Sequence, residues 1–166
     1  MSTSELQAAE PRPPDPETRV AHDDHDALRL WLRLLTCTML VERHVRARLK
    51  RRFGMSLPRF DLMAQLERAP AGLRMSELSQ RLMVSGGNVT SLVDRLVAER
   101  LVERAEVPGD RRAFSVRLTE GGRETFLAMA REHEAWIVEL AGGMPAADQR
   151  RLYELLGRFK RSLPLP

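Results

Sequence analysis

Residues 101–118 constrain the fold of this chain more than any other segment. Two short stretches suited to strands flank the pair Pro108-Gly109, and such a pair is typical of a turn. In the second stretch, the apolar residues Phe114, Val116 and Leu118 alternate with polar ones, which is the period of a half-buried strand. The segment therefore predicts a hairpin of two short strands.

On both sides of this hairpin, apolar residues recur at three- and four-residue steps, the spacing of amphipathic helices. Helices are expected over residues 26–53, 58–68, 75–82, 85–100 and 119–141, with a last helix from residue 145. Gly54, residues 69–72 and residues 142–143 carry the glycine and proline signals that separate them. The predicted fold class is mainly α with a small β-hairpin.

Length and cysteine content narrow the class of protein. The chain has 166 residues, a length that fits one domain or one domain with an extension. Cys37 is the only cysteine, and this excludes an internal disulfide and a metal site built on several cysteines. No apolar run approaches the ~20 residues of a membrane-spanning helix, and the N-terminus lacks a basic-then-apolar signal pattern. We therefore expect a cytoplasmic protein with no membrane partner.

Charge is distributed unevenly along the sequence. Residues 1–26 hold 2 of the 27 basic and 7 of the 23 acidic residues, which leaves 25 basic and 16 acidic residues in the remainder. A body with this excess of positive charge suits a polyanionic partner. Charge alone does not distinguish a protein with a polyanionic partner from a generically basic protein.

The first 25 residues are rich in proline, alanine and acids, and have no periodic apolar face. We expect them to form a disordered tail. The run His22-Asp23-Asp24-His25-Asp26 has metal-ligating side chains but no frame to hold them, so it is interpreted as solvated, and no metal or cofactor is predicted. The sequence has no G-x-S-x-G, P-loop or H-E-x-x-H motif, and no enzymatic activity is predicted.

One face of the helix expected at 85–100 has the composition of a DNA-reading surface. Its apolar stripe is predicted to pack inward, and Ser85 is placed to cap its first turn. The opposite face carries small, hydrogen-bonding or charged residues: Gly87, Asn88, Thr90, Ser91, Asp94 and Arg95. In the major groove, arginine can pair with guanine and asparagine with adenine. The alternative is an ordinary solvated helix face.

The tip of the hairpin carries Asp110, Arg111 and Arg112. Exposed guanidinium groups at a loop tip add little to stability, whereas a narrow A·T-rich minor groove attracts arginine. Asp110 can hold the Arg112 guanidinium by a paired hydrogen bond. Two helices joined by a tight turn and followed by such a hairpin have the order of a winged helix-turn-helix, which predicts binding to double-stranded DNA.

Four segments resemble the MarR family of bacterial transcription regulators: residues 76–82, 85–96, 107–112 and 118–122. The specific part is the Asp-Arg-Arg tip followed by Leu-Thr-x-x-Gly. The resemblance implies that the helix at 85–100 is the recognition helix, that Arg112 enters the minor groove and that Asp110 orients it. It also implies an obligate homodimer on a palindromic operator, typically a repressor that a small molecule releases.

The resemblance implies a division of the chain as well. A disordered tail at 1–25 is followed by a winged helix-turn-helix lobe at 55–119. Long N- and C-terminal helices at 26–54 and 120–163 flank this lobe and form the dimer interface.

An effector is suggested by residues 32–38 and 58–63, which look most similar to regulators of aromatic-acid catabolism, some of which respond to acyl-CoA thioesters. The resemblance implies an effector of this class, bound between the dimerisation helices and the DNA-binding lobe. Trp31, Phe60 and Met63 can wall an aromatic pocket, and Arg43, Arg46 and Arg59 can bind a carboxylate or phosphate. The alternative assigns the apolar residues to the core and the arginines to a solvated face.

Two other functions stay open. Some members of the family sense peroxide through one cysteine, but Cys37 lies mid-helix in an apolar stretch, so we expect a small buried packing residue. One open function is nevertheless a redox-sensing regulator built on Cys37. The other is a dimeric ligand-binding or interaction protein that has lost DNA binding.

Overall fold

The computed structural model describes residues 25–82, 86–107 and 110–164, with only the backbone described at 106, 107 and 110–113. The predicted disordered tail, apart from His25, and the predicted turn with Ser85 lie outside these residues. By contacts the chain divides into two units, residues 1–43 and 44–166.

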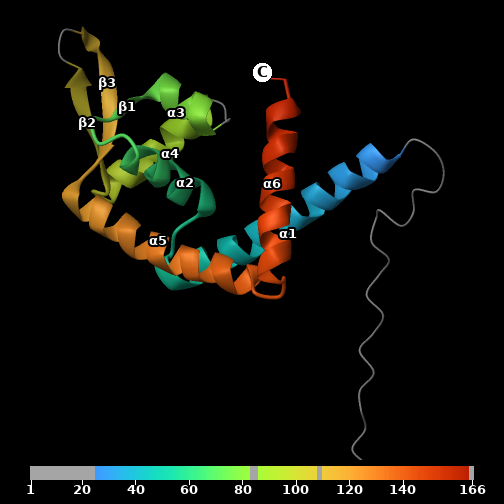
Figure 1. Cartoon of the computed structure of the whole chain (residues 1–166). Coiled ribbons are helices and arrows are strands. Elements are labelled where there is room, and N and C mark those ends of the chain that lie inside the picture. Colours follow the sequence, from blue (N-terminus) through green and yellow to red (C-terminus); the bar gives the residue numbers. More distant parts are fainter. Residues whose placement is uncertain (1–24, 83–85, 108–109, 165–166) are drawn as a thin grey trace, which may run out of the picture. The chain divides into compact units, whose positions relative to one another are not determined.

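The described residues form a mainly helical fold with a small antiparallel sheet (Figure 1). The helices are α1 (Asp26–Phe53), α2 (Leu57–Glu67), α3 (Met75–Leu82), α4 (Gly86–Ala98), α5 (Glu120–Ala141) and α6 (Ala146–Ser162). The strands are β1 (Leu73–Arg74), β2 (Val102–Val107) and β3 (Asp110–Leu118). The predicted fold class is confirmed, and the helix bounds agree with the apolar spacing to within about two residues.

The sheet contains a strand that the sequence pattern did not predict. Its order is β1-β3-β2, with both pairings antiparallel. β1 is only two residues long and follows Gly72, whose φ is 90°; its Leu73 lies opposite Val116. Two residues are too few to show a period of two, so the third strand leaves no signal in the sequence.

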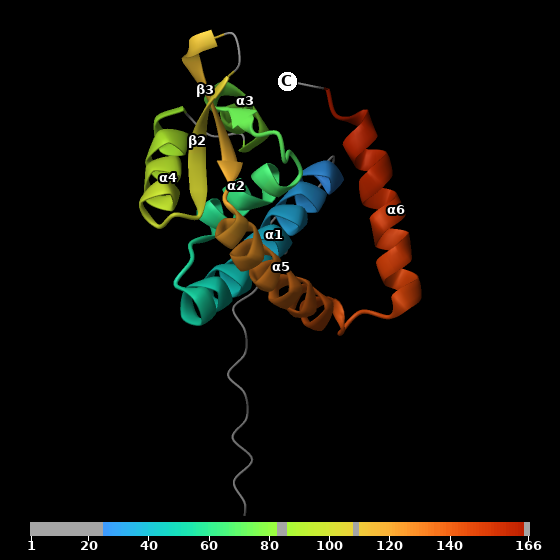
Figure 2. The same cartoon turned by 90° about the vertical axis from the view of Figure 1, so that its left-hand side faces the viewer.

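One hydrophobic core lies within residues 44–166. It is formed by the inward stripes of α2 and α4 together with residues from α1, α3, the sheet and α5. Leu62, Met63, Leu78, Val89, Val93, Leu96, Val116 and Met129 are all fully buried there. The hairpin β2–β3 rests on this core at its base, and its tip extends beyond α3 and α4 (Figure 2).

The end of α4 is closed by a Schellman motif. The Leu101 amide donates to the Leu96 carbonyl and the Arg100 amide to the Val97 carbonyl, each at 2.9 Å. Arg100 has a φ of 58° and is the only described residue other than glycine with a positive φ. The motif turns the chain directly from α4 into β2.

Replacing Arg100 with glycine is expected to raise the free energy of unfolding by about 1 kcal/mol, because glycine has no Cβ to oppose the left-handed conformation. Urea unfolding followed by circular dichroism measures the change. Arg100→Ala is the matched control, since it removes the side chain but keeps the Cβ. An equal gain in both variants would assign the effect to the side chain and contradict the prediction.

A second joint connects the sheet to α5. Thr119 caps α5: its Oγ1 accepts a hydrogen bond from the Gly122 amide at 2.9 Å and donates one to the Arg100 carbonyl at 2.8 Å. The Thr119 amide donates to the Leu101 carbonyl at 3.1 Å. A Cβ at Gly122 would lie 1.8 Å from that same carbonyl oxygen. The Leu-Thr-x-x-Gly segment is therefore the place where α4, β3 and α5 meet closely.

The last turns of α1 pack on α5. Arg48 donates two hydrogen bonds to the Glu139 carboxylate, at 2.6 and 2.7 Å, and its guanidinium lies 6.0 Å from the centre of the Trp136 ring. The hydrogen bond from Arg48 holds the pKa of Glu139 below its usual value and raises that of Arg48. Phe53 also meets Trp136, with ring centres 6.4 Å apart. These contacts fix the end of α1 on α5.

Two helical segments keep their apolar faces exposed in the single chain. In α6 no residue is buried, and Leu152, Leu155, Leu156 and Phe159 are each 38–44% exposed. In residues 26–43, exposed apolar side chains include Leu28, Leu30, Trp31, Leu35 and Met39. No helix among the described residues is long and apolar enough to cross a membrane.

The prediction that Cys37 is buried is wrong for the single chain, where Cys37 is exposed. Leu35, Leu40 and Val41, which lie near it in the sequence, are exposed as well. An apolar neighbourhood in sequence does not bury a residue when nothing covers the helix face.

Candidate nucleic-acid interface

α4 has the two faces that its sequence predicted. Val89, Val93 and Leu96 are fully buried on one side. The described residues of the predicted DNA-reading face, Gly87, Asn88, Thr90, Ser91, Asp94 and Arg95, are all exposed. Because the buried stripe is fixed in the core, the exposed face is held at a fixed orientation.

Hydrogen bonding within α4 limits what this face can offer. The Thr90 hydroxyl donates to the Gly86 carbonyl at 3.1 Å, so its hydrogen is already used within the helix. The Asn88 and Ser91 side chains make no hydrogen bond with another described residue. Arg95 likewise has no ion pair within the described part of the chain. These groups remain available to an external partner.

Asp94 is used differently from the rest of the face. Its carboxylate accepts a hydrogen bond from Arg104 on β2 at 2.5 Å. On the other side of the hairpin, Arg117 of β3 donates to Glu103 of β2 at 2.6 Å. The first pair ties α4 to the base of the hairpin and the second ties its two strands together. Sequence reasoning missed both, because their partners lie 10 and 14 residues apart on different elements.

The hairpin reaches its tip through regular pairing with one irregularity. β2 and β3 pair from Val102 opposite Leu118 to Val107 opposite Asp110, with a bulge between Glu106 and Val107. A bulge increases the local twist of a hairpin. The side chains of Asp110, Arg111 and Arg112 lie outside the described residues, so their pairing stays a prediction.

α3 packs against α4. Its side chain Leu78 is fully buried, and the Glu77 carboxylate accepts a hydrogen bond from the Arg74 amide at 2.7 Å. This is one half of a capping box, which stabilises the start of a helix. α3 is therefore a short but firmly anchored first helix of the pair α3–α4.

Four of the predicted effector-binding residues, Arg46, Arg59, Phe60 and Met63, lie within residues 44–166. Phe60 and Met63 are core residues, 6% and 0% exposed, and Phe60 packs against Phe126 with ring centres 5.4 Å apart. Trp31 is 55% exposed, and Arg43 and Arg46 are exposed. The cavities beside Arg123, beside Trp136 and along α6 are lined by none of these residues.

Arg59 is already paired within the chain. It is 9% exposed and forms an ion pair with Glu99, which directly follows α4. A buried charge needs a partner, because leaving it unpaired costs several kcal/mol. Arg59 thus links α2 to the end of α4, and its binding of a ligand carboxylate stays a prediction. Its Nε is buried without a hydrogen bond to any described residue.

Metal-binding groups do not gather in the part of the chain that the structure describes: no three His, Cys, Asp or Glu residues there could hold an ion together. What the described residues do assemble is a helix pair with an exposed polar face and a twisted hairpin beside it. A helix pair of this kind followed by an antiparallel hairpin defines a winged helix-turn-helix protein.

Comparison with known proteins agrees with this class. A sequence profile of the MarR family matches residues 53–113. The crystal structure of a MarR family transcriptional regulator from Silicibacter pomeroyi is 33% identical, with a TM-score of 0.74; the match covers 86% of this chain and all of that one. The chain belongs to the MarR family of transcription regulators.

Two further relatives are similar over most of their length. The transcriptional regulator PecS of Dickeya dadantii (strain 3937) is 28% identical over 114 residues, which are 68% of this chain and 69% of PecS. FabT of Streptococcus pneumoniae, solved in complex with DNA, is 25% identical with a TM-score of 0.69; the match covers 82% of this chain and 96% of FabT.

Proposed function

We propose that this chain is a DNA-binding transcription regulator that reads the major groove with the exposed face of α4. The observation that carries the proposal is the pairing of a fully buried stripe with an exposed face whose Asn88, Ser91 and Arg95 have no partner among the described residues. Arginine and asparagine on such a face read guanine and adenine. The crystal structure of FabT in complex with DNA supports DNA binding by a protein of this fold.

The hairpin tip is proposed to hold the adjacent minor groove, with Arg112 inserted and Asp110 orienting it. Replacing Arg112 with alanine is expected to weaken binding to the upstream region of its own gene by about tenfold or more. A mobility-shift assay measures the loss. Arg131→Ala, an exposed arginine on α5, is the matched control and should bind as the wild type does. Unchanged affinity of Arg112→Ala would refute the role of the tip.

We further propose that the chain acts as a homodimer on a palindromic operator. The apolar residues exposed on α6 and along residues 26–43 support this, since contiguous apolar surface of this kind marks an interaction site. The dimerisation segments are those expected from the sequence, 26–54 and 120–163, around a DNA-binding lobe at 55–119. Sedimentation velocity tests the assembly, and a monomer at micromolar concentration would exclude it.

The regulation that we propose is repression released by an aromatic acid or its CoA thioester. Trp31, Arg43 and Arg46 support this class of effector, because they are exposed and carry an indole face and guanidinium groups. Thermal shift with a panel of aromatic acids and their thioesters tests it. If no compound raises the melting temperature or releases DNA, the effector class is wrong.

One observation favours a second candidate. Cys37 is exposed, which meets one of the two requirements for a redox-sensing thiol. If peroxide alone changes DNA affinity and Cys37→Ser abolishes that change, the redox regulator replaces the ligand-responsive one. If no DNA fragment is bound under any condition, the protein is a ligand-binding or interaction protein.

A further inference from the structure

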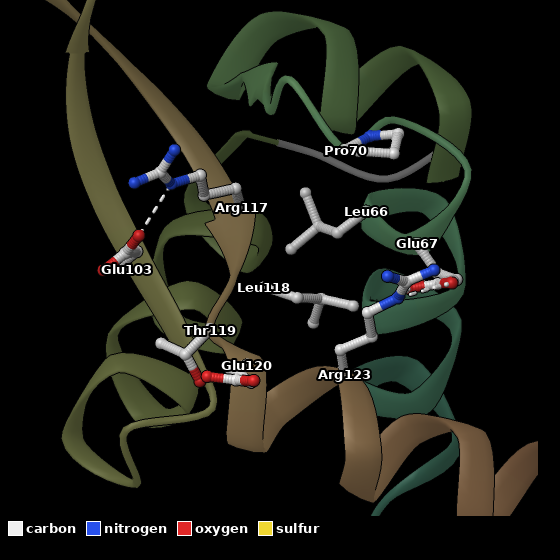
Figure 3. A pocket seen from close by; sticks show the side chains of 9 residues that line it. All are labelled: Leu66, Glu67, Pro70, Glu103, Arg117, Leu118, Thr119, Glu120 and Arg123. Atoms are coloured by element: carbon white, nitrogen blue, oxygen red, sulfur yellow. Dashed lines mark hydrogen bonds and ion pairs between the residues drawn. The ribbon is translucent and has the colours of Figure 1, made fainter.

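A cavity of about 370 Å³ lies at the base of the hairpin, and the residues that line it include none from α4 (Figure 3). One wall is the end of α2, the opposite wall is formed by β2 and β3, and the third side is the first turn of α5. The size falls within the range of small-molecule sites, roughly 300–1,000 Å³. Nothing in the proposed DNA contact uses this cavity.

The middle of the cavity is apolar. Leu66 from α2 and Leu118 from β3 point into it from opposite walls, and Pro70 closes its upper side in the view of Figure 3. Leu66 is 1% exposed, so this floor is continuous with the core. A flat hydrocarbon body placed here would cover apolar surface on both walls.

Charged side chains surround this floor, and most of them neutralise one another. Arg123 binds Glu67 at 3.1 Å, and Arg117 binds Glu103 at 2.6 Å. The two pairs lie on opposite walls (Figure 3). Either arginine would have to give up its carboxylate before it could bind a ligand anion.

Glu120 is the exception. Its exposed carboxylate forms no hydrogen bond or ion pair with any described side chain. It lies beside Thr119 at the bottom of the cavity in Figure 3. The lining thus presents three carboxylates against two guanidinium groups, and the unpaired charge is negative.

We propose that this cavity is a binding site for a small organic cation with a flat apolar body. The hydrocarbon part lies between Leu66 and Leu118, and an amidinium or ammonium group binds the Glu120 carboxylate. A charge-assisted hydrogen bond of this kind is stronger than a neutral one. The charge preference is opposite to that of an aromatic acid, so this site is distinct from the one proposed for the effector.

Occupancy of the cavity would bear on DNA binding if the proposed function holds. The ligand contacts Thr119 and Glu120, and Thr119 is hydrogen-bonded to the carbonyl of Arg100 at the end of α4. A ligand held there biases the angle between α5 and α4. Binding itself is measured without DNA, so failure of the proposed function and failure of this site give different results.

The test uses three aromatic probes of one shape and different charge: 2-naphthamidinium, neutral 2-naphthamide and anionic 2-naphthoate. Isothermal titration calorimetry on the full-length protein is expected to show the cation binding at least about tenfold more tightly than the amide. Glu120→Gln should remove this difference. Glu124→Gln, one turn further along α5 and outside the cavity, is the matched control and should retain it.

Glu120→Lys provides a second variant, in which the preference should reverse to 2-naphthoate. Amide chemical shifts of Leu118 and Thr119 should move on titration with the cation. No saturable binding of 2-naphthamidinium to the wild type, equal binding of the three probes, or unchanged selectivity in Glu120→Gln would each overturn the proposal.

Discussion

Replacing Gly122 with alanine is expected to lower the free energy of unfolding by about 3 kcal/mol or more. The new Cβ would lie 1.8 Å from the Leu101 carbonyl oxygen and 2.7 Å from its carbon, and both are backbone atoms that cannot rotate away. Overpacking of a well-packed site costs about 1–3 kcal/mol, and a clash with backbone lies at the upper end. For a domain of this size, each kcal/mol lowers the melting temperature by about 2–4 °C.

The neighbouring glycine is a sharp control for this experiment. A Cβ at Gly121 would meet nothing within 4 Å, although it lies in the same first turn of α5. Gly121→Ala should leave stability unchanged or raise it by up to about 1 kcal/mol, because alanine favours the helix. Differential scanning calorimetry measures the melting temperature of both variants. Similar melting temperatures for the two would refute the close approach at Gly122.

Replacing Arg95 with glutamate is expected to weaken binding to the upstream DNA by at least about 100-fold. In the proposed contact, Arg95 reaches the DNA from the exposed face of α4, and a well-placed arginine contact accounts for about 1–3 kcal/mol. A dimer loses the contact twice, and the new carboxylate also repels the phosphates. Fluorescence anisotropy at fixed ionic strength measures the loss, because such affinities depend strongly on salt.

Arg131→Glu changes the net charge by the same amount on α5, where the side chain is exposed and unpaired within the described part of the chain. It should weaken binding by no more than about tenfold through long-range repulsion alone. Equal losses in Arg95→Glu and Arg131→Glu would mean that overall charge, and not the face of α4, governs binding. Circular dichroism of each variant confirms that the fold is kept.

Much of the fold could be predicted because it follows from local patterns. The apolar steps of α4 and the alternation in β3 each occur within a few turns or residues, where a single sequence carries the signal. The exposed polar face of α4 followed directly from this, since fixing the buried stripe fixes what remains outside. The end of α1 at Gly54 could be predicted in the same way, because glycine readily adopts the positive φ of 64° found there.

The parts that could not be predicted depend on contacts between distant segments. The sequence around Arg59 is the same whether its side chain faces a ligand or pairs with Glu99. Its partner Glu99 lies 40 residues away in the sequence, so no local pattern indicates the pair. The pair of Asp94 with Arg104 depends on how β2 leaves the end of α4. The prediction that Cys37 is buried is wrong for a related reason, because the neighbours of a residue in sequence do not determine what covers its helix face.

The Leu-Thr-x-x-Gly segment is part of the resemblance to the MarR family, and the structure supplies a physical reason for its Thr and Gly. Thr119 is needed for its hydroxyl, which both accepts and donates, and Gly122 is needed because a backbone oxygen occupies the space of a side chain. Neither requirement can be read from composition or period. A glycine inside a helix that otherwise favours alanine is the one local hint of a close approach.

The double role of the Thr119 hydroxyl has a consequence for how the protein opens. A single oxygen joins the end of α4 to the first turn of α5, and the adjacent Thr119 amide closes on the Leu101 carbonyl. Breaking either bond removes one of the two protein partners of the Thr119 hydroxyl. The amides of Thr119 and Gly122 should therefore exchange with deuterium at one common rate, as members of a single cooperative unit. Thr119→Val removes the hydroxyl that makes both bonds, so the exchange rates of the two amides should then differ.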